Sequence, residues 1–574
     1  MSEVSLSARH ATASEGAGRL PLWLRILGVR LLAPAALAIL SIVMFVPGVF
    51  QVPPLDRDEP RFAQASKQMA ETGDFVDIRF QDEARHKKPA GIYWLQAAAV
   101  EASGFGDEAP IWVYRLPSQI AAVLSVLLVY WAARAFVSPQ AAFVAGVFAA
   151  ITIILGVEAR IAKTDATLLA TILAAQGALA RLWLNGRAAR RWGWIFIFWT
   201  ALGVSVLVKG PVGPMVAGLT IASLCVVRRE VAWLKALAPL PGIAWFALVV
   251  APWFVAIHLA TDGAFFNEAV GKDFVGKIGA GQESHGAPPL THLAAMFATF
   301  WPLPAFLILA IGAIRRRLSS DVVLFTLAWV LPSWVVFELV ATKLPHYTLP
   351  LLPALSILTA AALVEGSRRE AGRISRWAAA AVYFVPAFGL AAANFAVPVA
   401  LGLWPSPPGA VLAIIGFVAA FAATRQFAAG RALYALAPAV GASALIFAGT
   451  WAFTMPTLDP LWISPRLAAA VKDSAPCPDP LVASAGFNEP SYVFLQGTDT
   501  LLTDAAGAAN HLAGETNERC RIAVVERRRE AGFLKALSAE GISAEEVGRV
   551  SGININGGDR LDIGVYRRGS EQDG

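Results

Sequence analysis

Long runs without any charged residue set the strongest limit on how this chain can fold. The core of a lipid bilayer is about 30 Å thick, and about 20 apolar residues cross it as a helix. The proline cluster at 404–408 divides the overlong run at 377–424 into two, because proline cannot continue a helix there. The sequence therefore predicts thirteen spans of a polytopic α-helical membrane protein. The charge-free runs are 31–55, 116–133, 135–157, 166–180, 192–208, 210–227, 236–261, 284–314, 322–337, 344–364, 377–424 and 432–458.

The composition excludes most other classes. Charged residues make up 15% of the chain and hydrophobic residues 56%, whereas soluble domains contain about 25% charged residues. The net charge of +6 would indicate a nucleic-acid partner in a soluble protein. In a membrane protein it is better explained by basic cytoplasmic loops. The three cysteines form neither a disulfide scaffold nor a metal-binding spacing.

Basic residues mark alternate loops and so predict the orientation. The N-terminal tail is basic and lacks a small-residue cleavage site after the first apolar run, so that run is interpreted as a retained helix. Since basic loops face the cytoplasm, residues 1–30 form a cytoplasmic tail and the thirteenth span ends outside. The basic loops carry Arg134; Arg181, Arg187, Arg190 and Arg191; Arg228, Arg229 and Lys235; Arg315, Arg316 and Arg317; Arg368, Arg369, Arg373 and Arg376; and Arg425 and Arg431.

Two polar segments lie on the outer side. Residues 51–112 form a loop within the membrane core of 31–455, and residues 456–574 form a tail. The tail alternates expected strands with expected helices and so predicts a small α/β domain. The strands are expected at 480–485, 500–503 and 521–525, and the helices at 489–496, 505–513 and 528–540.

The cysteines of the tail, Cys477 and Cys520, lie in the compartment that permits disulfides. A disulfide and two free thiols both remain open from the sequence. Cys225 lies in a span and is expected to contribute only to packing.

Acids and cations gather at the outer ends of the spans. Asp58, Glu59 and Arg61 begin the first outer loop, and Lys87 and Lys88 follow later in it. Such a set can bind a phosphate while an acid handles a proton. For any one residue an ordinary solvated ion pair is an equal explanation, but the same residue types recur in later outer loops. The later candidates are Asp165, Lys209, Lys272, His285, Lys343 and Tyr347.

Other chemistry is less well supported. Lys209 could simply extend its amine to the membrane surface, although the following Gly210-Pro211 pair favours a designed turn. A lone histidine such as His285 is weak evidence for zinc. No glycine-rich nucleotide-binding loop is present. These features favour a phosphate-bearing substrate that is reached from the outer side and from within the bilayer.

Several motifs resemble the bacterial aminoarabinose transferases and the wider group of protein O-mannosyltransferase-like membrane glycosyltransferases. The motif in the first loop is specific, and the later motifs follow in the expected order. The motifs are Asp58-Glu59-Pro60-Arg61-Phe62-Ala63, Gly73-Asp74-Phe75, Lys88-Pro89-Ala90-Gly91-Ile92-Tyr93-Trp94, Val208-Lys209-Gly210-Pro211 and Lys343-Leu344-Pro345-His346-Tyr347-Thr348-Leu349-Pro350.

The resemblance implies a GT-C fold with an outer α/β domain. It also implies transfer of a sugar from a polyprenyl phosphate, typically undecaprenyl phosphate, to lipid A, another envelope glycan or a protein, on the periplasmic face of the bacterial inner membrane. Asp58 and Asp165 match the two acids of the family and are the expected catalytic residues. Arg61, Lys88, Lys209 and Tyr347 match other active-site positions, while Glu59, Lys87, Lys272, His285 and Lys343 complete the expected substrate-binding set.

One position departs from the family pattern. Many aminoarabinose transferases have Glu before the Lys-Pro pair, where this chain has Lys87. The acid that would contact a metal or an amino sugar is therefore a cation here. No metal ligand is assigned, and a divalent cation is the one cofactor candidate.

Two alternatives differ in class. A protein O-mannosyltransferase, or a transferase acting on another envelope glycan, would carry the same motifs. A lipid or solute transporter would place ionisable groups near the middle of the bilayer and show two related halves. The clustering of charges at the outer ends, together with the absence of related halves, favours the transferase.

Overall fold

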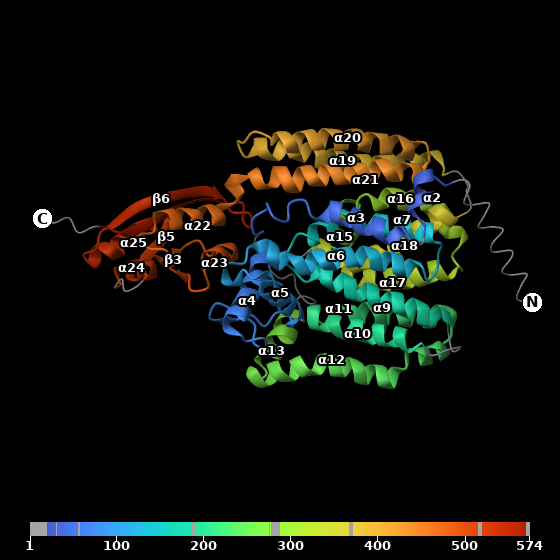
Figure 1. The fold of residues 1–574 in the computed structure, drawn as a ribbon, viewed down its shortest axis with the longest axis horizontal. Coiled ribbons are helices and arrows are strands. Elements are labelled where there is room, and N and C mark those ends of the chain that lie inside the picture. Colours follow the sequence, from blue (N-terminus) through green and yellow to red (C-terminus); the bar gives the residue numbers. More distant parts are fainter. Residues whose placement is uncertain are drawn as a thin grey trace, which may run out of the picture.

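Helices that run along the long axis dominate the molecule, and a small sheet domain lies at one end (Figure 1). The structure is a computed structural model that describes residues 20–29, 31–55, 58–185, 191–274, 276, 287–366, 371–514 and 519–569. The expected tail of residues 1–30 is described only over 20–29, which contain α2 (Leu22–Leu27).

Within these residues, nine helices are long and apolar enough to cross a membrane. Two of them combine consecutive elements. The spans are α6 (Ile111–Ala133), α9 (Asp165–Asn185), α10 (Trp192–Lys209), α12 (Pro239–Ala260), α17 (Asp321–Leu339), η4 with α18 (Pro345–Leu351 and Leu352–Glu365), α19 (Arg373–Ala400), α20 (Pro407–Ala428), and α21 (Ala432–Ala448) with η5 (Gly449–Thr454) and η6 (Met455–Thr457).

Further apolar helices occupy the remaining charge-free runs. Three are shorter, namely α3 (Ala33–Phe45), α7 (Pro139–Ala150) and α11 (Val212–Arg228). A fourth run forms α15 (Thr291–Thr299) and α16 (Leu303–Arg316), which are bent by 110° relative to each other. Each of the thirteen expected spans thus corresponds to a helix or a helix pair. Since short helices and a bent pair are included, the number of membrane crossings stays a prediction.

Short elements connect the spans at several points. They are α8 (Ile153–Glu158), η2 (Ala232–Leu237), α13 (Ala264–Phe266) and η3 (Asn267–Phe274), while η7 (Asp459–Leu461) links the last span to the C-terminal domain.

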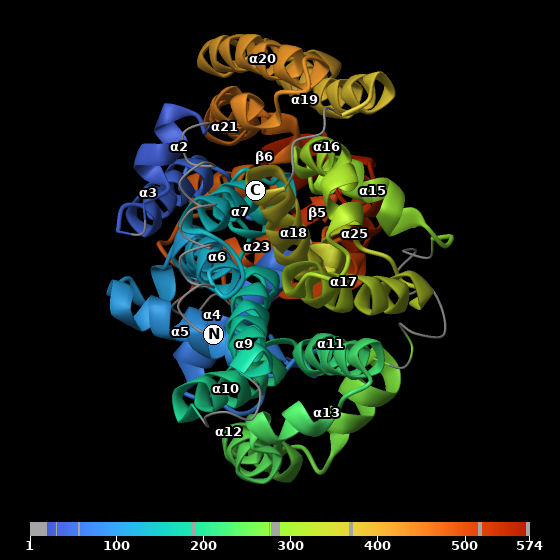
Figure 2. The ribbon, with the colours of Figure 1, turned by 90° about the vertical axis from the view of Figure 1, so that its right-hand side faces the viewer.

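Small residues allow the spans to pack closely. Gly177 of α9 faces the ring of Trp131 on α6, and a Cβ on Gly177 would lie 2.1 Å from that ring. Between helices in a bilayer, such close approach replaces the hydrophobic driving force that acts in water. Seen along the long axis, α19, α20 and α21 form a layer on one side of this packed centre, and α10 and α12 lie on the opposite side (Figure 2).

The first outer loop is a folded unit. It contains α4 (Asp58–Thr72), a short hairpin of β1 (Arg79–Phe80) and β2 (Glu83–Ala84), α5 (Gly91–Ser103) and η1 (Gly106–Glu108). Phe62 and Tyr93 stack with ring centroids 5.4 Å apart and share a buried cluster with Trp253 and Phe265 of the α12–α13 region. This apolar core gives the polar segment a fixed shape above the spans.

The C-terminal segment forms the expected small α/β domain. Its sheet has the order β4-β3-β5-β7-β6, with β3, β4 and β5 parallel and the last two strands antiparallel. The strands are β3 (Leu481–Ala485), β4 (Leu501–Thr503), β5 (Arg521–Glu526), β6 (Ala544–Ile553) and β7 (Arg560–Arg568). The helices are α22 (Ile463–Ser474), α23 (Pro490–Gln496), α24 (Ala505–Ala513) and α25 (Arg527–Ala539).

Helices cover both faces of this sheet. Val482 and Val524 pack with residues of α22 and α23, whereas Ala483 and Val525 pack with residues of α24 and α25. Strands buried on both faces are continuously apolar, which is why β3 and β5 were predicted correctly. The edge strand β4 was also predicted correctly, although it is only partly buried. The sequence analysis missed β6, β7 and α22, which contain more polar residues.

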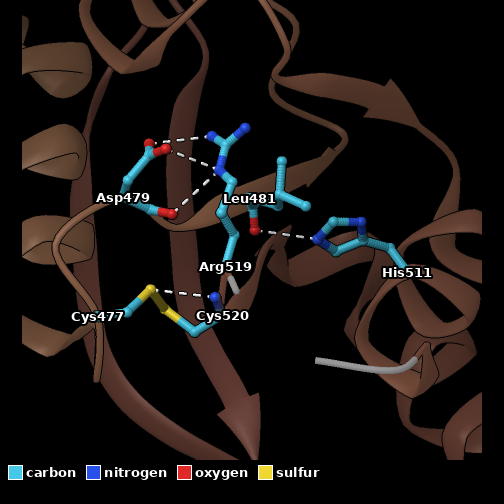
Figure 3. The surroundings of a disulfide bond; sticks show 6 residues. All are labelled: Cys477, Asp479, Leu481, His511, Arg519 and Cys520. Carbon is cyan, nitrogen blue, oxygen red and sulfur yellow. Dashed lines mark hydrogen bonds and ion pairs between the residues drawn. A yellow bond between two sulfur atoms is a disulfide. The ribbon is translucent and has the colours of Figure 1, made fainter. Parts of the chain in front are cut away.

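Cys477 and Cys520 form a disulfide. It joins the segments that lead into the neighbouring strands β3 and β5 (Figure 3). In the same place an ion pair of 2.8 Å links Arg519 to Asp479. The structure thus decides the question that the sequence left open in favour of the disulfide.

The C-terminal domain contacts the folded outer loop. Gln64 of α4 donates a hydrogen bond of 2.8 Å to the hydroxyl of Thr498, and the side-chain amide of Gln81 donates to the carbonyl of Thr498 at 2.9 Å. The rings of Tyr114 and Phe494 meet edge to face at 5.2 Å. The two polar segments therefore form one outer assembly over the spans.

Candidate active site

A cavity of about 270 Å³ lies where the folded outer loop meets the ends of the spans. Its walls come from the start of α4, the segment before α5, and the adjacent ends of α9, α10, α11, α17 and η4. Segments almost 300 residues apart in the sequence thus meet at one point. The cavity is lined by seven of the residues that the sequence analysis selected: Asp58, Arg61, Lys87, Lys88, Asp165, Lys209 and Tyr347.

Asp58 is the first residue of α4, and its side chain is exposed. An acid in the first turn of a helix is stabilised by the positive end of the helix dipole. The chain places a second acid, Glu59, directly after it, but the two side chains have different surroundings.

Glu59 is fully buried behind the cavity and does not line it. Its carboxylate accepts hydrogen bonds from Arg115 Nε at 2.7 Å and Nη2 at 2.9 Å, and from the backbone amides of Leu55 and Ala162 at 2.7 and 2.9 Å. A buried ion pair is retained when its remaining polar atoms are also satisfied.

Arg115 completes this arrangement from α6. Its remaining donors reach the carbonyls of Val49, Val52 and Pro53 at 2.8 to 3.0 Å. All five guanidinium donors are therefore in use. The pair ties the end of the first span to the start of α4, which sets the position of Asp58.

Lys87 and Lys88 lie just before α5, which approaches α10 closely. A Cβ on Gly91 would lie 2.7 Å from the carbonyl oxygen of Leu207. Only glycine permits this approach, which brings the Lys-Pro segment next to the end of α10. Lys209 is the last residue of α10, and Gly210 ends that helix with φ +68°.

Asp165 and Lys209 form the central ion pair of the cavity. Lys209 Nζ donates to Asp165 Oδ1 at 2.5 Å, and the amine lies 5.7 Å from the centre of the Tyr347 ring. Asp165 is buried at the N-terminus of α9, while Lys209 is at the C-terminus of α10. Both charges therefore also interact favourably with the dipoles of their helices.

Three further residues join this network, and the sequence analysis had not selected them as site residues. His346 lies between two acids, 3.8 Å from Glu158 and 3.9 Å from Asp165. Lys163 lies 3.9 Å from Glu158. The signal was present, because Glu158 and Lys163 lie near Asp165 in the sequence and His346 precedes Tyr347.

Burial raises the pKa of Glu158 to about 7, although the nearby Lys163 acts in the opposite direction. Glu158 ends α8 and lies outside the helices that can cross a membrane. The outer end of the bundle therefore contains a carboxyl group that titrates near neutral pH.

Apolar side chains also line the cavity. They include Leu168 of α9, Met215 of α11 and Phe337 of α17. Near the rim, the guanidinium of Arg85 lies 5.0 Å from the centre of the Phe62 ring. A cavity lined by both cations and apolar residues of membrane helices suits a molecule with a phosphate and a hydrocarbon chain.

The remaining expected residues lie elsewhere. Lys343 is buried, and its amine donates to the carbonyls of Ala287 at 3.0 Å and Val340 at 2.8 Å. Lys272 belongs to η3, but its side chain is outside the described residues, and so is the whole of His285. Over the part of the chain that the structure describes, no group of three or more His, Cys, Asp or Glu could hold a metal ion.

Comparisons with known proteins point in one direction. Residues 87–255 match the family model described as dolichyl-phosphate-mannose-protein mannosyltransferase. An undecaprenyl phosphate-alpha-4-amino-4-deoxy-L-arabinose arabinosyl transferase of Aeromonas salmonicida is 28% identical over 344 residues, which are 57% of this chain and 61% of that protein. The enzyme of the same name from Pseudomonas aeruginosa is 27% identical over 57% of this chain and 60% of its own length. The chain thus spans about three-fifths of the length of these curated relatives.

The solved structures extend the similarity to nearly the whole fold. ArnT from Cupriavidus metallidurans, bound to undecaprenyl phosphate, has a TM-score of 0.72 and 19% identity, covering 93% of this chain and 97% of its own. The oligosaccharyltransferase of Archaeoglobus fulgidus has a TM-score of 0.52 and 12% identity, covering 89% and 71%.

These findings confirm the resemblance that was inferred from the motifs. The chain is a multi-pass membrane protein with the GT-C fold and a small C-terminal sheet domain.

Proposed function

We propose that this protein is a membrane glycosyltransferase that moves a sugar from a polyprenyl phosphate, such as undecaprenyl phosphate, to an acceptor of the bacterial envelope. One observation carries the proposal. Two acids, Asp58 and Asp165, and the cations Arg61, Lys88 and Lys209 line a single cavity that has apolar helices on one side. The relatives named for aminoarabinose transfer support the same reaction class.

The reaction is an inverting displacement in this proposal. The acceptor oxygen attacks the anomeric carbon, and the bond from that carbon to the phosphate oxygen breaks. When the acceptor is a hydroxyl group, Asp58 takes its proton as general base. When the acceptor is a phosphate, which is already ionised, Asp58 orients it and stabilises the positive charge that develops on the sugar.

The polyprenyl phosphate leaves with the bonding electrons, and its charge increases as it leaves. Arg61, Lys87, Lys88 and Lys209 stabilise this growing charge, and preorganised cations are most effective where water is excluded. Asp165 holds Lys209 toward the cavity, and Tyr347 contacts the same amine. The hydrocarbon chain of the donor lies along the apolar wall near Leu168 and Met215.

Other expected residues have supporting roles in this proposal. Glu59 positions Asp58 through Arg115, and Lys343 fixes the segment before η4. Lys272 and His285 remain candidates for substrate contacts.

The orientation follows from the alternating basic loops. We assign the cavity and the C-terminal domain of residues 456–574 to the periplasmic side of the inner membrane, and the N-terminal tail of residues 1–30 to the cytoplasm. The core of residues 31–455 then opens its site toward the compartment that contains the envelope acceptors. The disulfide of the C-terminal domain agrees with an oxidising compartment.

Lipid A is the first acceptor to test, because it is the envelope acceptor that the motif resemblance names first. The match of residues 87–255 to protein mannosyltransferases makes a protein acceptor the second candidate. Lys87, at the position where many aminoarabinose transferases have Glu, favours a hexose or another neutral sugar as much as an amino sugar.

The deciding experiment compares host cells that carry the parent gene, no gene, Asp58→Asn or the control Asp82→Asn. Asp82 is an exposed acid of the same outer loop and does not line the cavity. We expect the mass of lipid A to fall by one sugar in the deletion and the Asp58→Asn cells only. With purified protein, Asp58→Asn should lower transfer at least about hundredfold, the scale of general acid–base catalysis.

Unchanged lipid A in the deletion strain would move the acceptor to another glycan or to protein. Normal transfer by Asp58→Asn with any acceptor would contradict the role of Asp58. If the purified protein transferred no sugar from polyprenyl phosphate to lipid, glycan or protein, the proposed function would be overturned.

A further inference from the structure

A second cavity, of about 480 Å³, lies between the central helices and the layer of α19, α20 and α21. Its walls come from the C-terminal halves of α16 and α18 and from the first turns of α19 and α21. The helices of this layer lie beside α16 in both views (Figures 1 and 2). The cavity thus occupies a junction between two groups of spans.

This cavity lies at the opposite end of the bundle from the candidate active site. The span formed by η4 and α18 connects them, because Tyr347 at its start lines the first cavity and Leu363 at its end lines the second. A helical span of 21 residues is about 30 Å long, which is the thickness of the bilayer core. The second cavity therefore lies at the membrane face that the basic loops assign to the cytoplasm.

The wall of this cavity combines guanidinium groups with apolar side chains. Arg315 and Arg316 come from the last turn of α16, and Arg431 from the residue before α21. Ile308 contributes apolar surface deeper along α16, and Leu363 contributes apolar surface in the last turn of α18. Among the described residues, the lining contains no Asp or Glu. The arginines are therefore suited to an anion, and the apolar side chains are suited to a hydrocarbon chain.

The surroundings of the cavity mark a membrane interface. Tyr434 lines it and is 54% exposed, and Trp377, two residues after the lining residue Ser375, is 60% exposed. Tyr and Trp are enriched where the membrane meets water, since their rings have an apolar body and a polar tip. We therefore expect the arginines beside them to lie at the depth of lipid phosphates.

We propose that this cavity binds an anionic phospholipid of the adjacent leaflet. The phosphate lies against Arg315 and Arg431, which offer the planar donor geometry that phosphate groups favour, and an acyl chain follows the apolar walls of α16 and α18. Basic pockets between spans on the cytoplasmic side are suited to such headgroups. A soluble phosphate would use the arginines but would leave the apolar walls in contact with water.

The bound lipid would join the outer helix layer to the centre of the bundle. α19 packs on α16 and α21 packs on α18, and the cavity separates these contacts at the cytoplasmic end. Filling it restores contact between the two groups of helices. Binding to the folded protein alone also raises its resistance to unfolding.

The test uses the purified full chain in a neutral detergent. Native mass spectrometry measures binding of dioleoylphosphatidylglycerol, with dioleoylphosphatidylcholine as the zwitterionic comparison and inorganic phosphate as competitor. We expect saturable binding of phosphatidylglycerol, at least tenfold weaker binding of phosphatidylcholine, and no displacement by phosphate at the same concentration. Phosphatidylglycerol should also raise the unfolding temperature.

The variant Arg315→Gln/Arg431→Gln removes two cations from the cavity and should weaken binding of phosphatidylglycerol tenfold or more. The matched control Arg229→Gln/Arg425→Gln removes two exposed arginines from the same membrane face, outside the cavity, and should change it less than threefold.

Equal losses in both double variants would show diffuse surface attraction and overturn the proposal. Unchanged binding in the cavity variant, equal binding of phosphatidylcholine, or displacement by phosphate would also overturn it. The proposal does not depend on the transferase reaction, because Asp58 does not line this cavity. Asp58→Asn should therefore abolish transfer and leave this binding unchanged.

Discussion

The two ends of the helical bundle are both rich in cations, but they use them differently. At the outer end, cations are paired with buried carboxylates, as in Arg115 with Glu59 and Lys209 with Asp165. At the inner end, the exposed Arg315 and Arg431 line a cavity in which the described residues include no acid.

This difference separates two uses of charge. A buried pair fixes the geometry of reacting groups, at the cost of removing both charges from water. Exposed arginines retain their hydration and interact with whatever anion the membrane offers. A high density of charged residues therefore does not locate an active site by itself. Whether the cations are paired with buried carboxylates is the more informative feature.

The largest expected effect follows from breaking the pair behind Asp58. Arg115→Gln leaves the carboxylate of Glu59 buried without its cation, which should cost about 3–5 kcal/mol of stability. The same substitution at the other end, Arg315→Gln, should change stability by no more than about 0.5 kcal/mol. Unfolding temperatures at a fixed scan rate in detergent compare the two variants.

A second change tests the cause of that effect. Adding Glu59→Gln to Arg115→Gln removes the unpaired buried charge and should restore part of the loss. If Arg115→Gln and Arg315→Gln were equally stable, the buried ion pair of the outer end would contribute no more to stability than an exposed arginine of the inner end.

The next effect concerns catalysis in the proposed function. Lys209→Met should lower kcat by about 100-fold, the scale for loss of one preorganised group that stabilises a transition state. KM for the donor should change less, because the phosphate gains charge as it leaves. Lys67→Met is the control, since Lys67 lies on α4 beside Glu71 and does not line the cavity. Transfer assays with purified protein measure both, and a change of less than threefold for Lys209→Met would contradict its role.

The smallest expected effect is a pH dependence that only the outer end should have. The pKa of Glu158 rises from the ordinary 4.5 to about 7 through burial. The folded state therefore holds this proton more tightly than the unfolded state, so stability falls as the pH rises from about 4.5 to about 7. Glu158→Gln should lack this loss.

Unfolding temperatures between pH 5 and pH 8 provide the measurement. The difference between Glu158→Gln and the parent should grow as the pH rises from 5 to about 7 and then level off, and the exposed control Glu83→Gln should show no such growth. A constant difference over this range would mean that Glu158 does not titrate there.

Much of the fold could be predicted because its signals are local. A span needs only a long apolar run, and the strands β3 and β5 of the C-terminal domain are apolar because helices cover both of their faces. The strands β6 and β7 were missed, since their polar residues resemble those of loops. The bend between α15 and α16 falls at Pro302 and Pro304, a local signal that the sequence analysis did not use.

For the candidate site, the sequence determined which residue types are available and at which end of the bundle they gather. Asp58, Lys88, Asp165 and Lys209 were selected from motifs and charge alone. Glu59 was expected to bind substrate next to the catalytic Asp58, but its side chain is buried against Arg115 and does not line the cavity.

Only the tertiary structure decided which of these charges meet. Lys209 reaches Asp165, and His346 lies between two acids, because the starts of α9 and η4 meet the end of α10. The bond between Cys477 and Cys520 forms because β3 and β5 are neighbours in the sheet. Such pairings depend on distances between segments that are remote in the sequence, whereas apolar periodicity and loop charge depend on neighbouring residues. The sequence therefore determined the class of membrane protein, the apolar spans and the acids and cations that are available. The tertiary structure determined how these side chains are arranged around the cavity.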